Sequence, residues 1–170
     1  MENHLKNQTC CFFGHRKIVN TPLLAENVKD SIKNLIVNYH ISNFLFGSNS
    51  EFNDLCYKTV SELKKIYTKI NRIYVRAQFP DIDVSYKNYL LEYYEDTYYH
   101  QHMRNAGKAA YVERNFDMID NSCFCIIYYD KNYAPPLKKS GLMSQRPKSG
   151  TEIAYLYAVK KKLVIKNLFV

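Results

Sequence analysis

Apolar residues along the chain form short continuous runs that alternate with stretches of helical periodicity. The strand-like runs cover residues 8–13, 41–46, 70–76, 122–129 and 163–169. Helical spacing is found between them, for example at Leu24, Val28, Ile32 and Leu35. The runs are apolar throughout, which is typical of parallel strands covered on both faces. We therefore predict an α/β fold of the Rossmann-like kind: a mostly parallel sheet of about five strands, with helices on both faces, in one domain over residues 1–170.

Three of the five glycines stand at predicted strand-to-helix turns: Gly14, Gly47 and Gly150. Glycine allows a ligand to approach the backbone closely, and the N–H groups of the following helix turn attract an anion. In a parallel sheet these turns meet at the carboxyl edge, where ligands collect. We therefore predict a phosphate or nucleotide site at that edge. The candidate ligand-binding residues beside the glycines are His15, Arg16, Ser48, Asn49, Glu51, Ser149 and Thr151.

Each of these polar residues also has a structural interpretation. Arg16 pairs a phosphate with its planar guanidinium, or belongs to a solvated turn. Ser48, Asn49 and Glu51 contact a ribose or a phosphate, or they cap the helix that begins near Phe52. Both interpretations stay open at this point.

The net charge of +8 is concentrated near the end of the chain. Residues 1–130 hold 15 basic and 15 acidic side chains, whereas residues 131–170 hold nine basic ones against Glu152 alone. A basic region around a glycine turn suits a compact anion as well as nucleic acid. The stretch from Tyr86 to Tyr99 carries six of the sixteen tyrosines but is acidic, which argues against a phosphate backbone there. A subunit interface or a flap over the pocket fits it better.

Cysteine and histidine positions give no metal site. The five cysteines are odd in number and show no C-x-x-C spacing, so we expect buried free thiols. We expect no metal and no cofactor. No apolar run approaches the ~20 residues that cross a bilayer, so we expect no membrane contact and a cytoplasmic protein.

Four segments together resemble a known group of proteins. "CCFFGHR", "FLFGSNSEFNDLCY", "AAYVERNFDMIDNSCFCIIYYD" and "KSGTEIAYLYAVKKK" are similar to small bacterial proteins of the SLOG superfamily. That superfamily includes the lysine-decarboxylase-like phosphoribohydrolases and the fold of DNA-processing protein A. The resemblance implies a Rossmann-like domain whose glycine loops bind nucleotides. It also implies that Arg114 and Asn115 lie beside the crevice, although an ion pair of Arg114 with Asp117 or Asp120 is an alternative.

The sequence departs from the enzymatic branch of that superfamily. The hydrolases carry a PGGxGTxxE pattern, but the position three after Thr151 is Ala154, and Glu152 lies about 200° away around a helix. Glu152 is therefore only a weak catalytic candidate.

Three functions follow, in order of preference. The first is binding, as a sensor or sequestering protein, of a nucleotide-derived small molecule such as an ADP-ribose-like or nucleoside monophosphate-like ligand. The alternatives are a nucleotide N-glycosidase and a DNA-binding module. We expect a homo-oligomer and do not expect nucleic acid as the partner.

Overall fold

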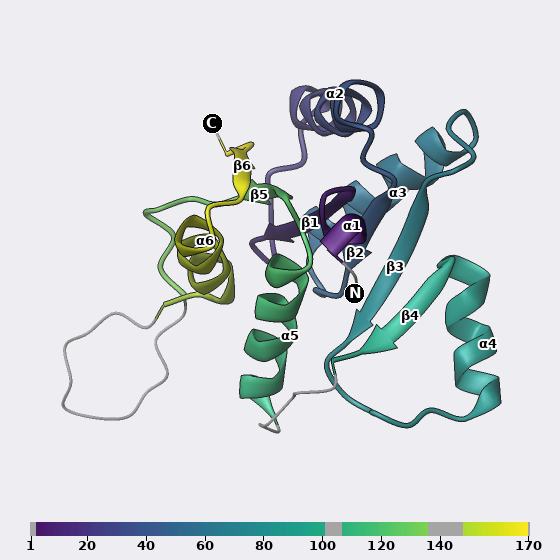
Figure 1. The fold of residues 1–170 in the computed structure, drawn as a ribbon. Helices are drawn as coiled ribbons and strands as arrows, with labels where there is room; N and C mark the ends of the chain where they lie inside the picture. Colours follow the sequence, from purple (N-terminus) through teal and green to yellow (C-terminus); the bar gives the residue numbers. More distant parts are fainter. Residues whose placement is uncertain (1–2, 101–106, 136–147, 170) are drawn as a thin grey trace, which may run out of the picture.

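A single parallel sheet forms the centre of the molecule. The structure is a computed structural model, and it describes residues 3–100, 107–135 and 148–169. Six strands lie in the order β4-β3-β2-β1-β5-β6, and every neighbouring pair is parallel (Figure 1). The strands are β1 (Thr9–Gly14), β2 (Asn43–Phe46), β3 (Asn71–Arg76), β4 (Asp96–Tyr99), β5 (Phe124–Tyr128) and β6 (Val164–Asn167).

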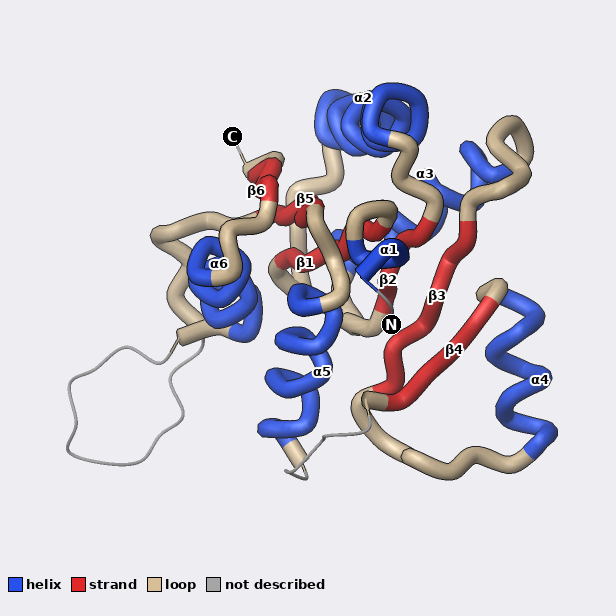
Figure 2. The backbone as a smooth tube through the Cα atoms, viewed as in Figure 1, coloured by secondary structure: helices blue, strands red, loops and turns tan. Residues whose placement is uncertain are grey.

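Helices connect the strands, and side-chain caps fix where several of them begin. The helices are α1 (Asn3–Lys6), α2 (Pro22–Tyr39), α3 (Glu51–Lys64), α4 (Val84–Tyr93), α5 (Lys108–Asp120) and α6 (Gly150–Lys160). The side chains of Thr21, Ser50, Asp83 and Ser149 accept hydrogen bonds from the first turns of α2, α3, α4 and α6. Figure 2 shows the helices around the sheet.

Alternate residues of the strands bury opposite faces of the sheet. Cys10 and Phe12 belong to a core formed with α2 and α3, whereas Cys11 and Phe13 belong to a second core with α5 and α6. Both faces of β1 are fully buried. The strands are therefore apolar throughout because helices cover both faces of the sheet, as predicted.

The predicted fold class is confirmed, with one more strand than expected. Sequence analysis missed β4 and α4, which lie in the tyrosine-rich stretch. β4 is a four-residue edge strand, "DTYY", in which only Thr97 is buried, so it lacks the continuous apolar run of the inner strands. In α4 only Leu90 is buried, so little helical periodicity marks it.

Candidate functional site

The order in which strands are added to the sheet reverses between β1 and β5. Strands β2 to β4 lie on one side of β1 and strands β5 and β6 on the other, so ligands are expected beyond the carboxyl ends of β1 and β5. His15 follows β1 at this point and is buried. Its Nε2 accepts a hydrogen bond from the backbone N–H of Asp130 at 2.9 Å, and its ring stacks on Tyr133 with centroids 4.1 Å apart. Side chains of the protein itself therefore occupy this part of the crevice.

His15 is uncharged at neutral pH in this setting. Burial lowers the pKa of His15, because it disfavours the imidazolium, although the charge of Asp130 acts in the opposite direction. A neutral ring that accepts at Nε2 carries its proton on Nδ1. The residue joins the β1 and β5 loops, and ligand contact by it stays a prediction.

The turn after β1 is shaped by packing with α3. A side chain at Gly14 would overlap Phe52, so glycine allows α3 to lie directly on the end of β1. Arg16 next to it is exposed, and its carbonyl accepts from the N–H of Glu51 at 3.0 Å. The guanidinium of Arg16 makes no ion pair within the described ranges, so it is available to an anion.

The β2–α3 turn is held mainly by its own polar side chains. Ser50, which sequence analysis did not select, is the N-cap of α3. The hydroxyl of Ser48 accepts from Asn53 at 3.2 Å. Glu51 pairs with Lys17 at 2.6 Å and accepts from the N–H of Ile18 at 3.0 Å, and this pairing lowers the pKa of Glu51.

These bonds give Ser48 and Glu51 structural partners. Asn49 is exposed at the tip of the turn. In this segment Ser50 caps α3. Contact of Ser48, Asn49 and Glu51 with a ligand stays a prediction.

Arg114 links α5 to the carboxyl ends of β2 and β3. Its Nη1 donates to the carbonyl of Gly47 and, at 3.4 Å, to that of Val75, while its Nε donates to the side chain of Asn115 at 2.9 Å. A Cβ on Gly47 would lie 2.5 Å from Nη1 of Arg114 and 2.9 Å from the carbonyl oxygen of Val75. Glycine at position 47 therefore makes room for the guanidinium.

Arg114 is a buried cation without a carboxylate partner in the part of the chain that the structure describes. Its exposed fraction is 3%, and burial lowers its pKa to about 10, so it stays charged at neutral pH. Asp117 instead accepts from Tyr98 and His100, and Asp120 pairs with Lys161. The alternative of an ion pair between Arg114 and either aspartate is therefore wrong. An unpaired buried cation is costly, and it favours a site for an anion.

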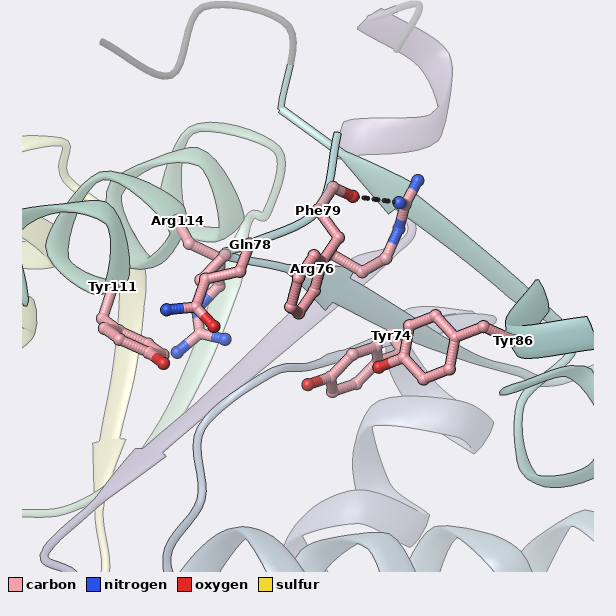
Figure 3. A pocket seen from close by; sticks show the side chains of 8 residues that line it. Tyr74, Arg76, Gln78, Phe79, Tyr86, Tyr111 and Arg114 are labelled. Carbon is pink, nitrogen blue, oxygen red and sulfur yellow. Dashed lines mark hydrogen bonds between the residues drawn. The ribbon is translucent and has the colours of Figure 1, made fainter. Parts of the chain in front are cut away.

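Arg114 lies in a recess at the end of β3 that we call the Arg114 recess (Figure 3). The recess has a volume of about 80 Å³. In Figure 3 the side chains of Arg114, Gln78 and Tyr111 lie close together, while Arg76 points away from them, toward the carbonyl of Phe79. The lining residues are Tyr74, Arg76, Ala77, Gln78, Phe79, Tyr86, Tyr111 and Arg114.

Sequence analysis missed every lining residue except Arg114. Tyr74 and Arg76 belong to β3, Gln78 and Phe79 follow it, Tyr86 is on α4, and Tyr111 is on α5. They come from three separate stretches of the sequence, and no glycine marks them. One sequence signal could have indicated them. The third apolar run, residues 70–76, has a polar end, and this end lies at the same edge of the sheet as the glycine turns.

The last predicted segment forms the start of α6. Ser149 caps the helix by accepting from the N–H of Glu152 at 3.1 Å, and Thr151 is buried. Gly150 is exposed, and a Cβ there would meet no atom within 4 Å among the described residues. Phosphate contact at residues 149–151 is an open prediction, but glycine is not required at position 150 by packing. The side chain of Glu152 is partly exposed, and a catalytic role for it stays a prediction.

The described residues also bear on the expectations about metal ions, the membrane and the cysteines. Within the described residues, no cluster of three or more histidine, cysteine or acidic side chains has a geometry that suits a metal ion. No helix in the described ranges has the length and apolar character needed to span a bilayer. All five cysteines are free thiols, and four of them are buried.

The parallel six-stranded sheet with helices on both faces defines a Rossmann-like α/β protein. The chain is similar in structure to DNA processing protein A (DprA) from Streptococcus pneumoniae, with a TM-score of 0.58 and 13% sequence identity over 95% of this chain and 50% of that one. It is also similar to DNA processing protein A from Helicobacter pylori, with a TM-score of 0.58 and 13% identity over 96% of this chain and 67% of that one. The chain thus spans half of the Streptococcus protein.

The comparisons with sequences give a different result. No family model and no curated protein matches the chain. At 13% identity the structural likeness shows the fold alone. It agrees with the Rossmann-like fold that the SLOG resemblance implied, while membership of that superfamily stays a prediction.

The expectation about nucleic acid needs a correction. The Helicobacter pylori structure is described by its single-stranded DNA binding mode, which contradicts our expectation that nucleic acid is not the partner. The physical reason lies in how the tyrosine-rich stretch was interpreted. We judged it by its acidic neighbours in sequence, whereas the fold brings Tyr86 to the same recess as Arg76 and Arg114, which come from other elements.

Proposed function

We propose that this protein binds single-stranded nucleic acid, with single-stranded DNA as the first candidate, at the carboxyl edge of its sheet. The observation that carries the proposal is Arg114, a buried guanidinium without a carboxylate partner in the described part of the chain, at a recess lined by tyrosines. Proteins that bind single strands combine cationic groups with aromatic side chains on which bases stack. The proposal also draws on the single-stranded DNA binding mode described for one structurally similar protein.

Two features of Arg114 suit it to a phosphate. Its Nη1 and Nε are held by the carbonyl of Gly47 and the side chain of Asn115, so the guanidinium has a fixed orientation. Its Nη2 makes no hydrogen bond within the described residues and remains for a ligand. A guanidinium held in this way forms charge-assisted hydrogen bonds with phosphate oxygens at a small entropy cost.

The aromatic side chains of the recess suit unpaired bases. Tyr86 and Phe79 are exposed by 38% and 63%. Tyr111 is also exposed, and the guanidinium carbon of Arg114 lies 5.8 Å from the centre of its ring. In duplex nucleic acid the base faces are covered by stacking, so exposed rings beside a phosphate site favour a single strand.

Direct binding measurements test the proposal. Fluorescence anisotropy with an internally labelled oligo-dT of about 12 nucleotides, a length within the usual site sizes, should give saturable binding. Tyr86→Leu should weaken it by about 1–3 kcal/mol, the usual loss for one stacked base. Arg114→Gln should weaken it at least as much. Lys166→Gln, which removes one exposed charge on β6, is the matched control and should have little effect.

Three outcomes distinguish this function from the others considered. Absence of binding to single strands by the folded protein would contradict the proposal. Equal affinity for a mononucleotide and for the oligonucleotide would favour the small-molecule function that we first expected. Release of free base from a nucleotide, lost in Glu152→Gln, would favour an N-glycosidase.

A further inference from the structure

The chemistry of the Arg114 recess bears on which part of a strand it accepts. We propose that the recess takes a terminal phosphate, that is the phosphomonoester at the end of a nucleic acid strand, in preference to an internal phosphodiester. This inference rests on the proposed function, and it names the chemical group that the same site recognises.

The size of the recess is the first argument. Its volume of about 80 Å³ is well below the ~300–1,000 Å³ of ordinary ligand pockets. It is lined by the end of β3 with its following loop, by Tyr86 of α4, and by two residues of α5. A recess of this size holds one chemical group. An internal phosphate would have to enter it with a nucleotide attached on each side, whereas a terminal phosphate enters with one.

The groups that line the recess are the second argument. Arg114 offers Nη2, Tyr74 and Tyr111 each carry a hydroxyl group, and Gln78 carries an amide. No carboxylate lines the recess. A phosphomonoester presents three terminal oxygens to such donors, whereas a diester presents two. The set of donors therefore matches the monoester better.

Charge is the third argument. A monoester carries a charge of about −1.5 to −2 at pH 7, against a single negative charge on a diester. A guanidinium that is only 3% exposed has lost most of its hydration, and a stronger counter-charge offsets that loss better. The preference should therefore depend on the second ionisation of the monoester, which has a pKa of about 6.

Competition binding with matched strands tests the inference. The probes are oligo-dT strands of about 12 nucleotides with a 5′-phosphate, a 3′-phosphate or no phosphate, together with thymidine monophosphates and inorganic phosphate. We expect one phosphorylated strand to bind at least about tenfold more tightly than the unphosphorylated one, which corresponds to about 1.4 kcal/mol. The gain should shrink as the pH falls below about 6.

A conservative variant keeps the test independent of folding. Tyr111→Phe removes only a hydroxyl group from an exposed residue, so it should fold normally, and it should reduce the preference for the phosphorylated strand. The readout is the ratio of the affinities for the phosphorylated and the unphosphorylated strand, which should fall in Tyr111→Phe. A matched control is Tyr93→Phe, an exposed tyrosine of α4 that does not line the recess.

The failures of the two proposals can be told apart. If all three strands bind equally well, the terminal-phosphate inference is wrong while the proposed function stands. If the monophosphates or inorganic phosphate bind as tightly as the phosphorylated strand, the recess recognises the phosphate without the strand, and the inference is also wrong. If no strand binds, the proposed function itself fails.

Discussion

Gly47 and Gly150 have opposite surroundings, although both stand at strand-to-helix turns of the same sheet edge. A side chain on Gly47 would press on Arg114 and on the carbonyl of Val75, whereas one on Gly150 would point into open space among the described residues. Neither glycine has a positive φ, so the difference between them is one of space and not of backbone conformation.

The two glycines therefore make a matched pair of variants. Gly47→Ala should destabilise the protein by about 1–3 kcal/mol, the usual cost of inserting atoms into a packed region, and should weaken strand binding because Arg114 is displaced. Gly150→Ala should leave stability unchanged or raise it by up to ~1 kcal/mol, because alanine is favoured over glycine in a helix. Urea denaturation and anisotropy measure both effects. Equal destabilisation by the two substitutions would contradict this account.

Residues of the site were predictable only where a sequence signal marks them. Gly47 and Arg114 were found separately, one from a turn and the other from a resemblance, and the structure joins them by a hydrogen bond. Tyr74, Gln78 and Tyr111 could not be found, because their role depends on three elements meeting at one place. Sequence patterns report the local chain, not which side chains of distant elements share a recess.

His15 connects the loops that follow β1 and β5, because its side chain accepts a hydrogen bond from the N–H of Asp130. Its pKa is lowered by burial in the folded state, while the unfolded chain has a value of about 6.5. Below that pH His15 is protonated in the unfolded chain more readily than in the folded protein. The contribution of His15 therefore makes the protein less stable as the pH falls from about 7 toward the folded-state pKa, and it has no effect above pH 7.

The variant His15→Gln isolates this effect. Glutamine can still accept the hydrogen bond from the N–H of Asp130, but it does not titrate. Between about pH 5 and pH 7, the free energy of unfolding of the wild type should fall more steeply with acidification than that of the variant. Thermal or urea denaturation at several pH values measures the slopes. Identical slopes would show that His15 is not held neutral by the fold.

The elements that were easy to predict are those that the sheet buries on both faces. β1 and β2 are buried at every position, and each contains a run of apolar residues, Cys10 to Phe13 in β1 and Phe44 to Phe46 in β2. β4 is at the edge of the sheet and α4 is mostly exposed, so neither needs an apolar pattern. These two elements carry the tyrosine-rich stretch, and Tyr86 of α4 reaches the recess. The prediction therefore failed at the elements where the surface meets the candidate site.

For the whole molecule, the lysines at the end of α6 do not mark the candidate site. Helix α6 begins at Gly150, at the carboxyl edge of the sheet, and ends at Lys160, so Lys160 and Lys162 lie toward the opposite edge. The double variant Lys160→Gln, Lys162→Asn should therefore bind oligo-dT nearly as well as the wild type. The asparagine suits the positive φ at position 162.

The salt dependence of strand binding, measured in the same variants, distinguishes a cation that contacts a phosphate from one that lies far from the strand. Each phosphate contact adds about 0.7 to the slope of log K against log salt for a single strand. Arg114→Gln should lower that slope, while the double lysine variant should leave it unchanged. If the lysine variant lowers the slope and Arg114→Gln does not, the strand binds near the end of α6. The homo-oligomer stays a prediction.

A crystal structure of the protein with a short 5′- or 3′-phosphorylated oligo-dT would show directly whether Arg114 binds the strand. We expect a phosphate within hydrogen-bond distance of Arg114, with the neighbouring base against Tyr86, Phe79 or Tyr111. A strand that is well defined in the electron density but lies away from the carboxyl edge of β2 and β3, with the Arg114 recess free of phosphate, would contradict the account.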